Sequence, residues 1–75
     1  MAITRRYSVT GMTCGHCVSA VTEELRALPG VQQVDVDLVP GGVSTVTVTS
    51  DAPLAEADVR AAVDEAGYEL AGVQA

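Results

Sequence analysis

The hydrophobic pattern of this 75-residue chain changes its period several times, and the order of those changes limits the possible folds. Alternation between two faces predicts strands over residues 3–10, 34–38 and 44–49, and residues 68–73 offer a short final strand. Apolar residues at helical spacing predict a helix from Cys17 to Leu28 and a second helix through Val59, Ala62, Val63 and Ala66. The predicted order is therefore βαββαβ.

Proline and glycine mark the ends of these elements. Pro29-Gly30 ends the first helix, Pro40-Gly41-Gly42 turns the middle two strands into a hairpin, and Gly67 ends the second helix. Asp51-Ala52-Pro53 offers a cap and an early proline for that helix.

This element order describes an α+β, ferredoxin-like sandwich, in which two helices cover one face of a four-stranded antiparallel sheet. The other face should stay largely exposed. Tyr7 and Tyr68 are the two aromatic residues, so the core must consist of Val, Leu, Ile and Ala. With no repeat or linker in the pattern, residues 1–75 are expected to form a single domain.

The charge balance limits the partners of the chain. The chain has ten acidic residues, four arginines and no lysine, which gives a net charge of −6, so a nucleic-acid partner is not expected. A protein with a positive patch would be attracted, although solubility alone also explains the acidity. Neither a signal peptide nor a membrane-spanning run is apparent, and we expect a soluble, cytoplasmic protein.

Cys14 and Cys17 are the two cysteines of the chain, and they lie between the first predicted strand and the first predicted helix. A helix N-terminus favours thiolates, and two thiolates three residues apart can hold one soft cation. A scaffold disulfide would close too short a loop to stabilise the fold much. With a single histidine besides, the chain lacks the four ligands of a closed zinc site. We therefore predict that the two thiolates bind Cu(I), which accepts a low coordination number.

The segment Gly11-Met12-Thr13-Cys14-Gly15-His16-Cys17 resembles the signature of the heavy-metal-associated domain family, Gly-Met-x-Cys-x-x-Cys. The resemblance extends to Pro29-Gly30-Val31, the valine-rich hairpin and Ala66-Gly67-Tyr68. Among family members, the chain most resembles the small bacterial cytosolic copper chaperones. The resemblance implies a carrier without enzymatic activity. Such a carrier passes Cu(I) to a copper-exporting P-type ATPase, with a copper-responsive repressor as a second partner.

The resemblance also assigns roles around the two cysteines. It implies that Met12 packs beneath the loop instead of binding the metal, and that Tyr68 faces the metal site, where its hydroxyl can reach a ligand sulfur. A plain core role for Tyr68 stays open. We expect His16 to point outward, either as a solvated residue or as one that tunes the thiolates.

The remaining residues near the loop have simpler expected roles. Gly11 and Gly15 are expected to shape the loop, and the Thr13 hydroxyl to cap the helix. Arg5 and Arg6 are interpreted as solvated strand residues.

Three other interpretations of the chain stay open. It could be a metal-binding domain of the copper ATPase itself, a thioredoxin-like dithiol oxidoreductase, or a mercury carrier. Carriers of the last kind are exported, and the chain shows no signal peptide. The metal-free protein is expected to be a monomer, and a copper-bridged dimer is a further possibility for the loaded form.

Overall fold

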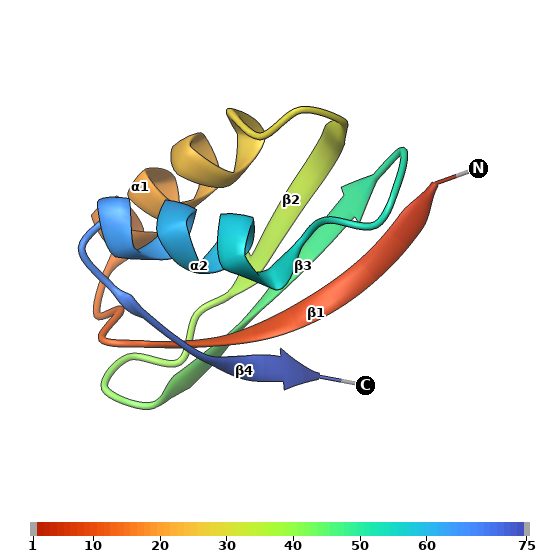
Figure 1. The fold of residues 1–75 in the computed structure, drawn as a ribbon. Helices are drawn as coiled ribbons and strands as arrows, with labels where there is room; N and C mark the ends of the chain where they lie inside the picture. Colours follow the sequence, from red (N-terminus) through yellow and green to blue (C-terminus); the bar gives the residue numbers. More distant parts are fainter. Residues whose placement is uncertain (1, 75) are drawn as a thin grey trace.

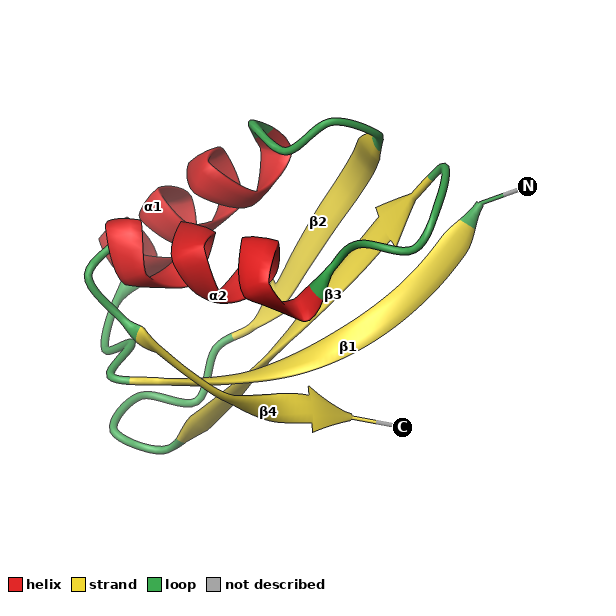
Figure 2. Cartoon of the chain, viewed as in Figure 1, coloured by secondary structure: helices red, strands yellow, loops and turns green. Residues whose placement is uncertain are grey.

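The computed structural model describes residues 2–74, and their order of elements is the predicted βαββαβ (Figure 1). The elements are β1 (Ile3–Thr10), α1 (Gly15–Arg26), β2 (Val31–Asp37), β3 (Val43–Ser50), α2 (Glu56–Glu65) and β4 (Glu69–Gln74). The four strands form one antiparallel sheet in the order β2-β3-β1-β4. Both helices lie on the same face of this sheet (Figure 2). The predicted ferredoxin-like architecture is confirmed.

Aliphatic side chains fill most of the space between the helices and the sheet, as predicted, but Tyr7, Met12 and Cys17 also belong to this core. Helix α1 buries Cys17, Val21 and Leu25, which are spaced four residues apart on one side of the helix. The strands, α2 and the β1–α1 loop supply the rest of the core, which comprises Tyr7, Val9, Met12, Val46, Val48, Val59, Ala62, Val63 and Leu70. Burial of each Val or Leu side chain contributes about 1.5–3 kcal/mol, so this core is the main source of stability.

The face of the sheet opposite the helices is polar. Strand register places Thr4 beside Thr49 and Ser8 beside Thr45, and the Thr4 and Thr49 hydroxyls are 3.4 Å apart. The side-chain amide of Gln74 donates hydrogen bonds to the Ser8 hydroxyl at 3.0 Å and to the Thr45 hydroxyl at 3.2 Å. These contacts connect β4, β1 and β3 across a face that carries no helix.

The helix boundaries correct the prediction in two places. Helix α1 begins at Gly15, before Cys17, and ends at Arg26, because the chain tightens there so that the Leu28 amide donates to the Leu25 carbonyl at 3.1 Å.

Helix α2 has Ala55 at its N-cap with no side-chain cap, so the predicted Asp51 cap is wrong. The Asp51 amide donates to the Gly30 carbonyl at 2.8 Å, and its carboxylate accepts a hydrogen bond from Gln32. Asp51 therefore connects two loops, and Glu56 and Asp58 supply the negative charge that favours the start of α2.

Three connections meet at one end of the molecule (Figure 1). They are the β1–α1 loop with the cysteines, the β2–β3 turn and the α2–β4 loop. The beginning of β1 and the end of β4 lie toward the other end. Residues far apart in the sequence can therefore contact one another around the two thiols.

Neither helix of residues 2–74 has the length and the apolar character that crossing a membrane requires.

Candidate metal site

Cys14 and Cys17 lie one helical turn apart at the start of α1. Cys14 is the N-cap residue, with an extended backbone at φ −154° and ψ 178°. Its carbonyl accepts hydrogen bonds from the amides of Cys17 at 3.1 Å and Val18 at 3.4 Å, which closes the first turn. This turn brings the two Sγ atoms to 3.8 Å from each other.

The distance between the sulfurs suits a shared metal ion. Both cysteines are free thiols, because 3.8 Å is far longer than the roughly 2.05 Å of a disulfide bond. A zinc–thiolate bond is about 2.3 Å long, and two such bonds to one ion span at most about 4.6 Å. One soft ion of similar size can therefore contact both sulfurs without moving the backbone. Among residues 2–74 no group of three or more His, Cys, Asp or Glu side chains is placed to hold a metal.

The two thiols have different surroundings. Cys14 is exposed, whereas Cys17 is 6% exposed and belongs to the core. Hydrogen bonds lower the pKa of Cys17 from 9.0 to about 6, and the largest contribution comes from the Thr13 backbone amide, which donates to Cys17 Sγ at 3.4 Å. The Tyr68 hydroxyl contributes next, then the Cys14 backbone. Burial opposes these effects, and the deprotonated form of Cys17 still prevails at neutral pH.

Thr13 has a different role from the predicted one. The helix begins one residue later, with Cys14 as N-cap and no side-chain cap, so the prediction that the Thr13 hydroxyl caps α1 is wrong. That hydroxyl lies 3.8 Å from Cys17 Sγ. Both the amide and the hydroxyl of Thr13 are therefore directed toward the buried sulfur.

Met12 is completely buried and is part of the core. Its position agrees with the packing role that we expected. Gly11, directly before it, has φ +92°, and a Cβ atom there would lie 3.6 Å from Cδ1 of Tyr68. Gly11 thus allows the left-handed backbone with which the chain leaves β1.

Tyr68 connects the α2–β4 loop to the thiols. Its backbone amide donates to the Val63 carbonyl at 3.1 Å, and its ring packs against the core. The interaction with Cys17 raises the pKa of the Tyr68 hydroxyl, so that this hydroxyl stays protonated and acts as a donor. Tyr68 therefore packs against the core and interacts with Cys17, and its role toward a bound metal stays a prediction.

His16 and Gly15 occupy the exposed first turn of α1 between the two cysteines. The outward position of His16 agrees with the prediction. Gly15 has no positive φ, and a Cβ atom there would meet nothing within 4 Å. The expected loop-shaping role therefore holds for Gly11 but is wrong for Gly15, which is an ordinary helical residue.

One contact to the β1–α1 loop was not predicted from the sequence. The Gly41 amide, in the β2–β3 turn, donates a long hydrogen bond of 3.4 Å to the Met12 carbonyl. The turn itself is held by the buried hydroxyl of Ser44, which accepts a hydrogen bond from the Val39 amide at 2.9 Å. The sequence predicted a turn at Pro40-Gly41-Gly42, but a residue pattern carries no signal for what a turn will touch.

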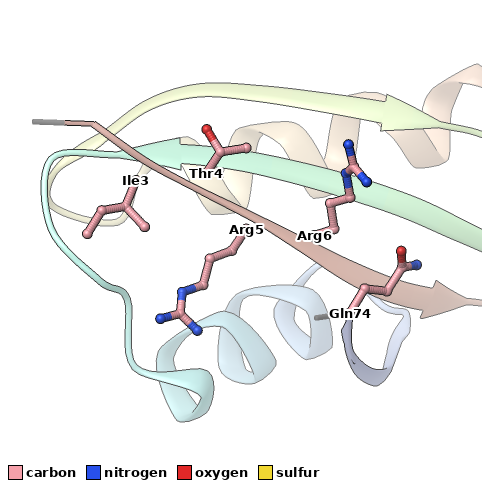
Figure 3. A pocket seen from close by; sticks show the side chains of 5 residues that line it. All are labelled: Ile3, Thr4, Arg5, Arg6 and Gln74. Atoms are coloured by element: carbon pink, nitrogen blue, oxygen red, sulfur yellow. The ribbon is translucent and has the colours of Figure 1, made fainter.

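A separate hollow of about 410 Å³ lies at the beginning of β1 (Figure 3). Its lining consists of Ile3, Thr4, Arg5, Arg6 and Gln74. The Arg5 and Arg6 side chains extend to opposite sides of β1 in this view. This hollow is at the other end of β1 from the cysteine loop, and it plays no part in the candidate metal site.

Comparison with known proteins supports the family resemblance. The family model for the heavy-metal-associated domain matches residues 6–69. The copper chaperone CopZ of Staphylococcus aureus is 38% identical over 63 residues, which cover 84% of this chain and 90% of that protein.

Solved structures of copper-binding relatives have a similar fold. A CopZ metallochaperone superposes with a TM-score of 0.78 at 35% identity, covering 91% of this chain and 98% of the other. The yeast copper transporter domain CCC2A, which was determined in apo and Cu(I)-loaded states, has a TM-score of 0.74 at 27% identity and coverages of 95% and 96%.

Proposed function

The chain belongs to the heavy-metal-associated domain family, and on that basis we propose that it is a copper chaperone which binds one Cu(I) ion through Cys14 and Cys17. The observation that carries the proposal is the pair of sulfurs 3.8 Å apart at the exposed start of α1. The relatives named as copper chaperones support copper as the cargo.

The choice of Cu(I) follows from the small number of ligands. Cu(I) is soft and binds thiolates, whereas zinc in closed sites takes four ligands and harder dications prefer oxygen. Two thiolates and one Cu(I) ion leave a net charge of −1. The N-terminal amides of α1 and the Thr13 amide offset that charge without any lysine, which the chain lacks.

Transfer would proceed by exchange of sulfur ligands. Cu(I) with two ligands has open coordination positions, so a thiolate of a partner can add before either bond to the chaperone breaks. Cys14 is exposed and Cys17 is buried and held by Thr13, so the bond to Cys14 is the accessible one to break first. A second partner thiolate then displaces Cys17. Each step exchanges one copper–sulfur bond for another, and copper stays Cu(I).

The proposed recipient is the amino-terminal domain of a copper-exporting P-type ATPase, and a copper-responsive repressor is a second recipient. The ATPase domain is supported by the likeness of this chain to a yeast copper transporter domain, because a recipient with the same fold would hold copper in a similar site. The net charge of −6 favours a recipient with a basic surface. We place this exchange in the cytoplasm.

Anaerobic titration of the reduced protein with Cu(I) against a chromogenic competitor tests the site. The parent protein should hold one Cu(I) ion, and the Cys14→Ser, Cys17→Ser double variant should hold none. Met12→Leu is the matched control, because it removes the third sulfur near the loop and keeps an apolar side chain of similar size. Retention of copper by the double variant would reject the site, and a preference for Zn(II) or Hg(II) in parallel titrations would reject the metal.

A second candidate function is supported by the match to the yeast transporter domain, which covers nearly the whole of both chains. In that case the sequence would be a metal-binding domain of a copper transporter. An antibody against this chain separates the two candidates in a lysate of the source cells. A chaperone gives a band near 7.7 kDa, and a transporter domain gives a band of a much larger membrane protein.

Sedimentation of the purified protein, with and without added Cu(I), tests the oligomeric state. We expect a monomer without metal, and a copper-bridged dimer would appear as a doubled mass when less than one Cu(I) per chain is added.

A further inference from the structure

The peptide unit between Met12 and Thr13 is held on both of its sides. Its carbonyl accepts a hydrogen bond from the Gly41 amide at 3.4 Å, and its N–H group donates to Cys17 Sγ at 3.4 Å. In a trans peptide the C=O and N–H groups lie in one plane and point in opposite directions. The β2–β3 turn and the sulfur therefore contact opposite edges of the same rigid plane.

We propose that the β2–β3 turn is a positioning element of the metal site, in which Gly41 fixes the orientation of the Met12–Thr13 peptide plane and thereby keeps the Thr13 amide directed at Cys17. If the plane rotates about its two flanking bonds, the Thr13 N–H group turns away from the sulfur. Gly41 does not touch the thiols and acts through this peptide unit alone. The consequence for the metal rests on the proposed function, whereas the orientation of the amide does not.

The turn has the features that such a role needs. Gly41 has φ +74°, a left-handed conformation that residues with a side chain rarely adopt. The hydroxyl of Ser44, a fully buried residue, accepts a hydrogen bond from the Val39 amide at 2.9 Å, and the Gly42 amide donates to the Val39 carbonyl at 3.0 Å. Met12 is anchored by complete burial. The peptide plane is thus held between a fixed turn and a fixed side chain.

The decisive experiment replaces the Gly41 amide with an ester, which removes the N–H donor and leaves every side chain in place. A chain of this length can be made by chemical synthesis and ligation. The matched control is the same replacement at Asp51, whose amide also joins two loops, by donating to the Gly30 carbonyl at 2.8 Å, but which takes no part in the thiol loop. Gly41→Ala and Gly30→Ala form a second pair, since Gly30 has a similar φ of +86°.

The readout is the exchange of the Thr13 amide proton with water, measured by NMR on the reduced, metal-free protein. We expect the Gly41 ester and Gly41→Ala to speed this exchange by about threefold to tenfold, the factor for one hydrogen bond of ordinary net strength. The amides of Val9 and Val46 in the sheet should keep their rates. The two control variants should leave Thr13 unchanged relative to those sheet amides.

Cu(I) affinity in competition with a chromogenic chelator is the second measurement. The Gly41 ester should bind Cu(I) about tenfold more weakly than the Asp51 ester, as for other losses of groups that support metal ligands. Unchanged Thr13 exchange in the Gly41 ester, or an equal change in the Asp51 ester, would overturn the inference. If the parent protein bound no Cu(I), the proposed function would fail, and the Thr13 measurement would still decide this inference.

Discussion

The backbone amide of Thr13 donates a hydrogen bond to Sγ of Cys17 at 3.4 Å, so the thiol that lies in the core is also the thiol whose anion is stabilised. Burial alone would keep a thiol protonated. Here a neutral donor from the main chain outweighs burial, and the exposed Cys14 beside it stays accessible. The site thus combines one anchored sulfur with one sulfur open to solvent.

The first prediction concerns the ionisation of Cys17. In the Cys14→Ser variant, the remaining thiol should be half ionised near pH 6, well below the usual 9.0, because hydrogen bonds from Thr13 and Tyr68 stabilise the thiolate. The ultraviolet absorbance of the thiolate, followed from pH 4 to 10 under reducing conditions, measures this. A midpoint near 9 in a folded variant would show that the donors do not act on this sulfur.

Tyr68→Phe should raise the pKa of Cys17, since it removes the second-largest of the stabilising hydrogen bonds and keeps the ring in place. Cu(I) affinity should fall by about tenfold, as is common when a group supporting a ligand is lost. Tyr7→Phe, which removes the other tyrosine hydroxyl from the core, is the control and should alter neither quantity. Equal behaviour of the two variants would place the Tyr68 hydroxyl outside the site.

Stability should depend on pH through the same thiol. The folded-state pKa of about 6 lies below the unfolded value of 9.0, so the unfolded chain binds more protons between these values. The contribution of Cys17 to the free energy of unfolding is complete above pH 9 and is lost as the pH falls through 6.

Urea unfolding of the reduced, metal-free protein at several pH values measures this contribution, with Cys17→Ser as the reference. The difference in unfolding free energy between the two proteins should grow from pH 6 to pH 9. A constant difference across that range would contradict the assignment.

Met12 offers a test of packing against metal binding. Met12→Ala should destabilise the protein by about 2–5 kcal/mol, because a fully buried side chain is removed from the core. Met12→Leu should cost less than about 1.5 kcal/mol and should keep the Cu(I) affinity of the parent. Thermal unfolding and Cu(I) competition check both variants. A folded Met12→Leu protein with weakened Cu(I) binding would make the thioether a ligand.

The element order could be predicted from the sequence because each element carries its own local signal. Alternation along β1 and the four-residue spacing of Cys17, Val21 and Leu25 require no knowledge of neighbouring elements. Two of the errors came from capping. Thr13 and Asp51 are good capping residues by type, but the polar groups of Thr13 contact Cys17, and those of Asp51 contact Gly30 and Gln32.

The candidate ligands were equally local, since Cys14 and Cys17 are three residues apart and the helix between them sets their geometry. The residues that surround the two cysteines come from distant parts of the chain. Gly41 is far from Met12 in the chain, and the contact between them arises only once β3 pairs with β1 and brings the two loops together. Tyr68 was found through family resemblance, because its own neighbours in the sequence do not point to a sulfur.

The three loops around the thiols lie at one end of the sheet, while β1 starts and β4 finishes toward the other (Figure 1). Attachments at either terminus would therefore be made on the side away from the copper ligands. The protein can be tethered to a chip, given a fluorescent tag or joined to further copies of itself in series without screening the sulfurs from an incoming acceptor.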